Sequence, residues 1–96
     1  MVHLLCRNKV ADFERWHEVF VSHRDAHQKA GLWLEQLWRD ANDPENVFFL
    51  FRVDDVGRAI TFMSTPDAEA AAAESGVVNG EYHFLNEAGV TASDAP

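Results

Sequence analysis

Hydrophobic and polar positions divide the chain into segments with the periods of strands and helices. Residues 2–9 are predicted to form the first strand. From Phe13 onward, apolar and aromatic side chains recur every three or four residues, which is the spacing of one helical face. Asp12 is expected to cap this helix and Gly31 to end it, so a single long helix is predicted between them.

The middle of the chain has the pattern of an antiparallel hairpin. Residues 32–53 contain two strand-like runs on either side of a turn rich in Asn, Asp and Pro. The loop is expected to hold about five residues and to be centred on Asp43 and Pro44.

A second helical region follows the hairpin. Residues 54–63 begin with acidic capping residues and place an apolar stripe on one side of a helix. The stripe consists of Val56, Ala59, Ile60 and Met63. Thr65 and Pro66 then have the pattern of a helix start, as cap and first helical residue, and the alanine-rich run after them is expected to be helical up to Gly76.

The last predicted strand covers residues 80–87, which completes the order strand, helix, strand, strand, helix, strand. This order predicts the α+β ferredoxin-like βαββαβ fold, an antiparallel sheet with the helices on one face. Residues 1–90 are expected to form one domain, because single domains most often run about 100 to 150 residues. Residues 91–96 are expected to form a flexible tail.

The strand of the hairpin's second half is apolar on both faces. One face carries Val47, Phe49, Phe51 and Val53. The other face carries Phe48 and Leu50, although an antiparallel sheet with one face in water normally alternates apolar with polar residues. If these two side chains stayed exposed, they would form an apolar patch of a kind that soluble monomers rarely show. A homodimer that pairs sheet against sheet is therefore predicted.

Charge and composition exclude several classes of partner. The chain has 8 Lys+Arg and 16 Asp+Glu residues, for a net charge of −8, so nucleic acid and anionic membrane are not expected to bind it. No apolar run approaches the ~20 residues that span a bilayer, and the apolar patch at the N-terminus is too short for a signal peptide. With a single cysteine, Cys6, the chain is predicted to be cytoplasmic.

Three segments resemble a known group of proteins. They are "KVADFERWHEVFVSHRDAHQKAGL", "LWRDANDPENVFFLFRVDDVGRAITFMSTPD" and "ESGVVNGEYHFL". Together they are similar to the dimeric α/β-barrel proteins of the antibiotic biosynthesis monooxygenase-like superfamily, and most of all to its small cyclase-like and stress-responsive members. The resemblance implies the fold, a sheet-to-sheet dimer and a ligand cavity between the sheet and the helices of each subunit.

The same superfamily contains cofactor-free monooxygenases, haem-degrading enzymes, cyclases, isomerases and members without an established activity. The haem-degrading branch uses an Asn on the first strand, which Asn8 could match, together with a Trp and a His near the second helix. Residues 55–76 contain neither Trp nor His, so haem degradation is disfavoured.

His23 and His27 are the candidate catalytic residues, because a pair four residues apart presents two imidazoles on one helical face. Three interpretations are open: a metal site, general acid–base chemistry, or polar packing at the edge of the core. No third ligand is fixed by the sequence and there is no H-E-x-x-H motif, so no metal is predicted. In an enzyme, His23 would act as acid or base, and His27 would support His23 or polarise the ligand.

The candidate substrate-binding residues are mostly aromatic. They are Trp16, Phe20, Trp33, Trp38, Phe62 and His83. Trp33 and Trp38 are expected on opposite faces of a regular strand, one in the cavity and the other at the dimer seam. His83 is expected in the cavity or at the interface. All of these side chains could instead be ordinary core residues.

The predicted function is to bind and transform a small hydrophobic or aromatic organic molecule. No cofactor motif is present, so no tightly bound cofactor is predicted, and the reaction is expected to be of the cyclase, isomerase or cofactor-free monooxygenase type. Cys6 is expected to be a small buried hydrophobe rather than a nucleophile. The alternative is a non-enzymatic ligand-binding or stress-associated homodimer in which both histidines are structural.

Overall fold

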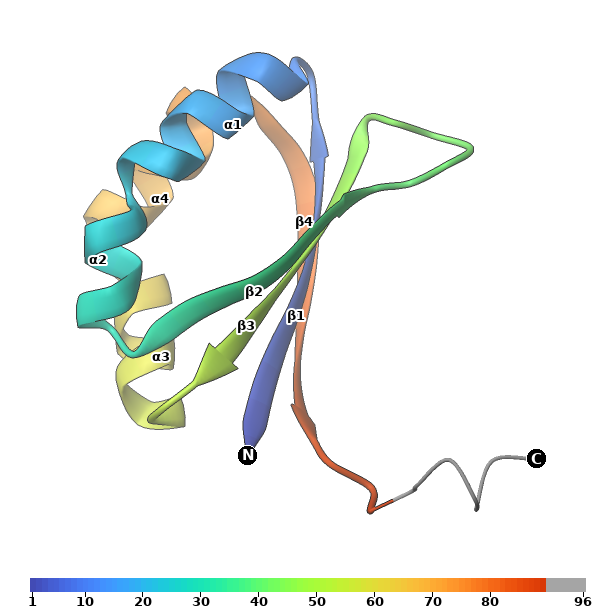
Figure 1. Cartoon of the computed structure of the whole chain (residues 1–96). Helices are drawn as coiled ribbons and strands as arrows, with labels where there is room; N and C mark the ends of the chain where they lie inside the picture. The colour runs from blue at the N-terminus through green and yellow to red at the C-terminus, as the bar shows by residue number, and fades with distance from the viewer. Residues whose placement is uncertain (90–96) are drawn as a thin grey trace.

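A four-stranded antiparallel sheet carries all the helices on one of its faces in the computed structural model, which describes residues 1–89 (Figure 1). The elements are β1 Val2–Val10, α1 Phe13–Ser22, α2 Arg24–Lys29, β2 Leu32–Arg39, β3 Asn46–Val53, α3 Val56–Met63, α4 Pro66–Glu74 and β4 Val77–Asn86. The strand order is β2-β3-β1-β4, so the predicted ferredoxin-like α+β fold is confirmed. The predicted tail at residues 91–96 lies outside the described residues.

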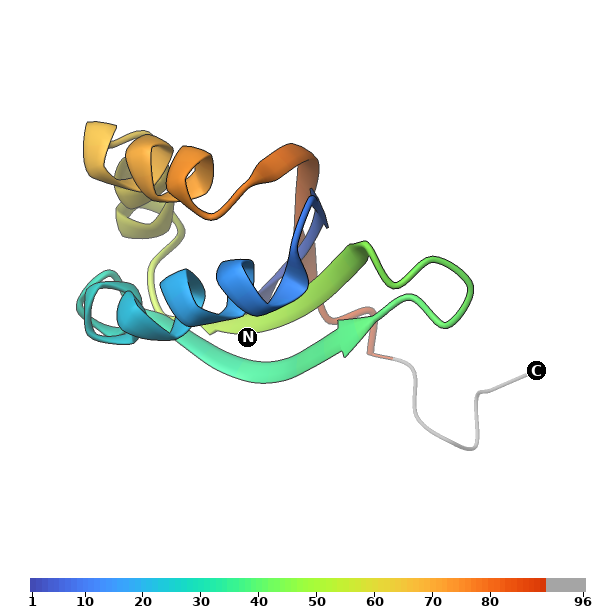
Figure 2. The same ribbon diagram turned by 90° about the horizontal axis from the view of Figure 1, so that it is seen from above.

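The helices form two rows over the sheet, α1 and α2 in one and α3 and α4 in the other (Figure 2). Within residues 1–89, none of the helices combines the length and the apolar character needed to cross a bilayer.

The first helical segment is broken at His23, so the prediction of one continuous helix up to Gly31 is wrong. Asp12 caps α1 as expected, with its Oδ1 accepting from the Glu14 amide at 3.0 Å. At the other end, the His23 amide bonds to the Phe20 carbonyl at 3.1 Å. The Ser22 hydroxyl donates to the Val19 carbonyl at 2.6 Å, and a side chain that competes for a helical carbonyl in this way bends a helix.

The second helical region follows the sequence closely at its caps. Asp55 Oδ1 accepts from the Arg58 amide at 3.0 Å, and Thr65 Oγ1 accepts from the Ala68 amide at 3.2 Å. The apolar stripe of α3 differs, because Ile60 is 48% exposed whereas Ala59 is fully buried. Val56, Ala59 and Phe62, which are spaced three residues apart, pack against the core. Ile60 is therefore turned outward.

β3 alternates between the two faces of the sheet as predicted. Val47, Phe49, Phe51 and Val53 are buried beneath the helices. Phe48, Leu50 and Arg52 are half-buried on the face without helices, which we call the open face. β3 pairs with β1 and β2, so its buried residues form the middle of the core.

A bulge in β2 places Trp33 and Trp38 on the same face of the sheet, so the prediction of opposite faces is wrong. Leu34 pairs with Phe51 and Gln36 pairs with Leu50, which leaves Glu35 as an extra residue. An extra residue shifts the alternation of side chains by one position. Trp33 therefore lies opposite Arg52, and Trp38 opposite Phe48, both on the open face.

Candidate functional site

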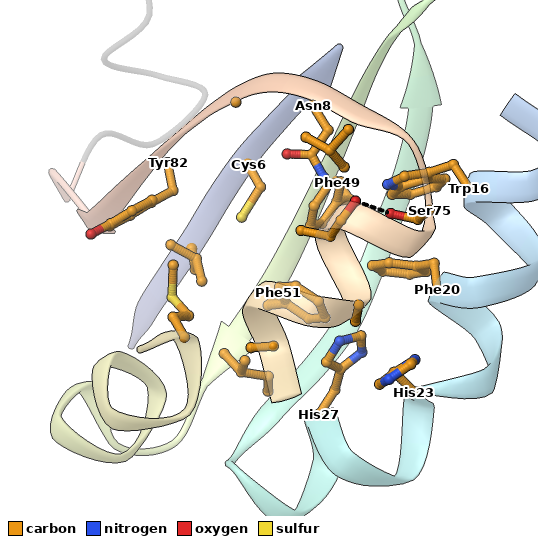
Figure 3. A pocket seen from close by; sticks show the side chains of 18 of the residues that line it. Cys6, Asn8, Trp16, Phe20, His23, His27, Phe49, Phe51, Ser75 and Tyr82 are labelled. Atoms are coloured by element: carbon orange, nitrogen blue, oxygen red, sulfur yellow. Dashed lines mark hydrogen bonds between the residues drawn. The ribbon is translucent and has the colours of Figure 1, made fainter. Parts of the chain in front are cut away.

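A cavity of about 260 Å³ lies between the sheet and the helices, at the place that the family resemblance implies (Figure 3). All four helices and strands β1, β2, β3 and β4 contribute to its lining. We call it the central cavity. Its lining is mainly apolar, and the polar exceptions include Asn8, His23, His27, Ser75, Glu81 and Tyr82.

The wall on the α1 side is a continuous layer of aromatic rings. Trp16 is 2% exposed and stacks on Phe20, with ring centroids 4.7 Å apart and an interplanar angle of 19°. Phe20 meets the edge of Phe49 from β3 at 5.1 Å. Stacked and edge-on rings at these separations hold one another in place, so the wall is preorganised for a flat apolar ligand.

His27 lies within this aromatic layer. Its ring centroid is 5.1 Å from Phe20, 5.3 Å from Phe51 and 5.7 Å from Phe62. Burial among these rings, together with the smaller effect of the nearby His23, lowers the pKa of His27 from 6.5 to about 4, so the imidazole is neutral at pH 7. Among residues 1–89, no side chain or backbone group forms a hydrogen bond with its ring nitrogens.

His23 lies at the break between α1 and α2. Its Nδ1 lies 2.9 Å from the Val19 carbonyl oxygen, and the Ser22 hydroxyl donates to the same oxygen. A carbonyl only accepts hydrogen bonds, so a neutral His23 carries its proton on Nδ1 and keeps the lone pair of Nε2 free. His23 and His27 lie next to each other at one end of the central cavity (Figure 3).

A polar group that the sequence left without a role in substrate binding lies farther along the same cavity. The Asn8 amide donates to the Arg7 carbonyl at 3.1 Å and accepts from Trp16 Nε1 at 3.3 Å. A Cβ atom on Gly80 of the neighbouring β4 would lie 2.6 Å from the terminal amide group of Asn8, so only glycine leaves room for this amide. A glycine inside a strand was the available signal, since it often marks such a close approach.

Cys6 lines the cavity with a buried thiol. Burial raises the pKa of this thiol to about 12, so it stays protonated at neutral pH. The prediction that Cys6 is a small buried hydrophobe rather than a nucleophile agrees with this environment.

The structure brings five of the eight predicted site residues together around the cavity. They are Trp16, Phe20, His23, His27 and Phe62. That these residues bind or transform a substrate stays a prediction.

Trp33, Trp38 and His83 lie outside the cavity, so the prediction that one of the two tryptophans lines it is wrong, and of the two places expected for His83, the cavity and the interface, the cavity is excluded. Both tryptophans are on the open face because of the bulge, and Trp38 is 46% exposed. His83 pairs with Leu5 on the open face, and its Nε2 lies 3.2 Å from Glu81 Oε2. Alternation along β4 turns its neighbour Tyr82 toward the cavity instead, and the sequence-based assignment missed that residue.

Within residues 1–89, no group of three or more His, Cys, Asp or Glu side chains is arranged to hold a metal ion. The histidine pair therefore lacks further ligands of these types in the described part of the chain.

The fold was compared with known proteins. No protein-family model matches the chain, and no curated protein matches its sequence significantly. A structure from Bordetella bronchiseptica, provisionally named an antibiotic biosynthesis monooxygenase, superposes with a TM-score of 0.73 at 12% identity, over 90% of this chain and 95% of that one.

Two further structures extend the likeness. One from Caulobacter crescentus, with the same provisional name, has a TM-score of 0.67 at 19% identity, over 90% of this chain and 88% of the other. An uncharacterized NIPSNAP domain protein from Burkholderia xenovorans has a TM-score of 0.66 at 14% identity, over 95% of this chain and 98% of that one. At the level of the fold, this chain is therefore similar to the antibiotic biosynthesis monooxygenase-like proteins, as the resemblance of its sequence implies.

Proposed function

We propose that the central cavity binds a small, flat, hydrophobic or aromatic organic molecule and that His23 and His27 act on it without a tightly bound cofactor. The observation that carries the proposal is the neutral imidazole of His27, which lies among three phenyl rings and has no hydrogen-bond partner in the described chain. The His27 side chain lines the cavity, so a polar atom of a bound ligand can supply this hydrogen bond. The names of the structures similar in fold support small-molecule chemistry of this type.

The two imidazoles suit different tasks. His23 presents the free lone pair of Nε2 and can accept a proton from an acidic C–H or O–H group of the ligand. In the resulting imidazolium, Nδ1–H still donates its hydrogen bond to the Val19 carbonyl, and this bond stabilises the positive charge. His27 stays neutral and can donate a hydrogen bond to the oxygen on which negative charge develops. The substrate class is thus a phenol or an enolisable ketone, and the reaction class that of a cyclase, isomerase or cofactor-free monooxygenase.

Binding is tested first by filling the cavity. Ala71 on α4 lines it, and Ala71→Phe should abolish binding of the aromatic ketone 2-tetralone, measured by isothermal titration calorimetry. Ala73 lies on the same helix, is exposed and does not line the cavity, so Ala73→Phe is the matched control. Equal affinity in the two variants would place the ligand outside the cavity.

Catalysis is tested by exchange of the acidic C–H protons of 2-tetralone for deuterium, followed by NMR. His23→Gln should slow the protein-catalysed exchange by about 100-fold, the typical contribution of a general base, while leaving the affinity nearly unchanged. His17→Gln, on an exposed position of α1 that does not line the cavity, should exchange at the wild-type rate.

A non-enzymatic binding protein is the second candidate. It is favoured by the part that His23 plays at the junction of α1 and α2, where its ring bonds to the Val19 carbonyl. If this function is correct, the wild-type protein binds 2-tetralone but does not accelerate exchange, and His23→Gln lowers the free energy of unfolding without changing the affinity.

We also propose that two copies of the chain pair through their open faces. This face holds Leu5, Trp38, Phe48, Leu50 and Leu85, of which Trp38 and Leu85 are more than 40% exposed. A sheet face with several partly exposed apolar side chains is typical of surfaces that bind another protein. A cytoplasmic location, proposed from the single cysteine, is compatible with such a dimer.

Sedimentation velocity tests the dimer. Leu50→Arg should give a monomer at micromolar concentration, because it places an unpaired charge in the centre of the open face. Ile60→Arg introduces the same side chain at an exposed position on α3 and should sediment like the wild type. A wild-type protein that sediments as a monomer would refute the pairing and would leave the proposal for the central cavity unaffected.

A further inference from the structure

A second hollow lies on the other side of the aromatic wall, between the helices α1 and α2 and the outer strand β2. It has a volume of about 320 Å³, and we call it the edge groove. Phe20, His27, Leu32 and Phe51 line both the edge groove and the central cavity, so they form the wall between the two spaces.

The charge of this groove differs from that of the protein as a whole. The chain carries 16 acidic and 8 basic residues, yet among residues 1–89 no carboxylate lines the groove, which contains Arg24, His17 and Gln28. A hollow free of acidic groups with a guanidinium at its rim attracts an anion locally, even on a protein of net charge −8.

Arg24 has no partner within the described residues, unlike every other arginine. The others bond or pair as follows: Arg7 with Glu81, Arg15 with the Glu74 carbonyl, Arg39 with the Pro44 carbonyl, Arg52 with Asp54, and Arg58 with the Lys29 carbonyl. In a chain with twice as many acids as bases, a cation left unpaired beside a hollow is available for a ligand.

The rest of the groove is apolar and accessible. Val21 is 53% exposed and Leu34 is 46% exposed, and both line the groove together with Leu37 and Phe51. Apolar side chains beside a free guanidinium match a molecule with an apolar body and one acidic group.

We propose that the edge groove is a second binding site, which takes an apolar monocarboxylate and binds its carboxylate through Arg24. The guanidinium can hold both carboxylate oxygens at once, and the Gln28 side chain lies on the same groove. The apolar body of the ligand packs on Leu34, Leu37 and Phe51. This site does not depend on the activity proposed for the central cavity, because its polar groups other than His27 lie outside that cavity.

The test compares two ligands that differ only in charge, 2-naphthoate and 2-naphthamide, against the full-length protein by isothermal titration calorimetry. Arg24→Gln should weaken binding of 2-naphthoate about tenfold and leave that of 2-naphthamide unchanged, since only the charged ligand gains a charge-assisted pair. Lys29→Gln is the matched control: it removes the same charge from the same short helix at an exposed position outside the groove, and both affinities should stay at the wild-type values.

A change of specificity gives a second readout that loss of folding cannot imitate. Arg24→Glu should bind 2-naphthylmethylammonium at least tenfold more tightly than the wild type does, while losing 2-naphthoate. Arg24 begins α2, where an acidic residue is compatible with the helix dipole.

NMR of the wild-type protein locates the ligand. The proposal expects 2-naphthoate to shift the side-chain Nε–Hε signal of Arg24 and the ring signals of His17. It is overturned if 2-naphthoate does not bind at millimolar concentration, if Arg24→Gln and Lys29→Gln bind it equally well, or if only signals of the central cavity, such as those of Asn8 and Tyr82, respond. Failure of the 2-tetralone experiments would leave these results unaffected.

Discussion

The two faces of β3 carry similar side chains in very different surroundings. Phe49 and Phe51 are at most 6% exposed under the helices, where they pack against other rings. Phe48 and Leu50, one residue away, are half-buried on the open face. The sheet alone therefore does not decide how buried a residue of β3 is, because the helices protect only one of its faces.

The histidines of the two faces differ in the same way. On the helix-covered face, His27 lies among phenyl rings and is neutral. On the open face, His3 lies 2.9 Å from Glu35 and His83 lies 3.2 Å from Glu81. The covered face thus holds an imidazole without a hydrogen-bond partner in the described chain, whereas the imidazoles of His3 and His83 on the open face lie beside carboxylates. A ligand site is expected where the partner is missing.

Removing a ring from the covered face should have the largest effect on stability. Phe51→Ala is expected to lower the free energy of unfolding by about 3–5 kcal/mol, because it deletes a buried aromatic side chain and leaves a cavity. Phe48→Ala on the same strand should cost less than half as much at low protein concentration. Urea unfolding measures both, and Phe51→Leu provides a milder variant if Phe51→Ala does not fold. Equal losses would mean that the open face is as well protected as the covered one.

The free energy of unfolding should depend on pH through His27 on the covered face. Since the pKa of His27 is about 4 in the folded state and 6.5 is the ordinary value, the unfolded chain takes up the proton first as the pH falls. Stability due to His27 is complete above pH 6.5, declines between pH 6.5 and 4, and does not change further below 4. The loss is expected to be about 3 kcal/mol.

The matching variants isolate this contribution. His27→Phe should remove the decline between pH 6.5 and 4 in urea unfolding experiments. His83→Gln, at a position with a 59% exposed side chain on the open face, should keep it. If His27→Phe unfolds with the same pH dependence as the wild type, then His27 is not desolvated in solution.

The features of this fold that depend on nearby residues were predictable from the sequence. The caps Asp12, Asp55 and Thr65 bond to amides two or three residues away, and the alternation of β3 needs only its own residues. His27 could be placed on the inner face by helical spacing alone, even though the helix is interrupted at His23.

The features that the sequence did not reveal depend on contacts between distant segments. The bulge at Glu35 is defined by pairing with β3, and it places Trp38 on the same open face as Trp33. The approach of Gly80 to Asn8 joins two strands far apart in the chain. The break at His23 is local. It depends on hydrogen bonds from both Ser22 and His23 to the Val19 carbonyl, which the spacing of apolar residues does not predict.

A methyl group at Gly80 on β4 should disturb the part of the cavity that Asn8 lines. Its Cβ would lie 2.6 Å from the terminal amide group of Asn8 and 3.1 Å from the Arg7 carbonyl, so the Asn8 amide must move. Gly80→Ala is expected to lower the free energy of unfolding by about 1–3 kcal/mol and to alter the near-ultraviolet circular dichroism of Trp16, the partner of Asn8. Adding Asn8→Ala removes the collision and should recover part of the loss. No recovery would mean that the Arg7 carbonyl, rather than the amide, opposes the methyl group.

The smallest effect is expected from the ion pair between His3 and Glu35, and it tests how wet the open face is. The two side chains are 24% and 40% exposed in the single chain, and exposed pairs contribute about 0.2–1 kcal/mol. Glu35→Gln should therefore cost less than 1 kcal/mol in a dilute solution of monomers, as measured by urea unfolding. In a sheet-to-sheet dimer the same pair would be desolvated, and a buried charge that loses its partner is costly. The cost of Glu35→Gln should then rise with protein concentration, whereas a cost that is independent of concentration would mean that the open face stays in contact with water.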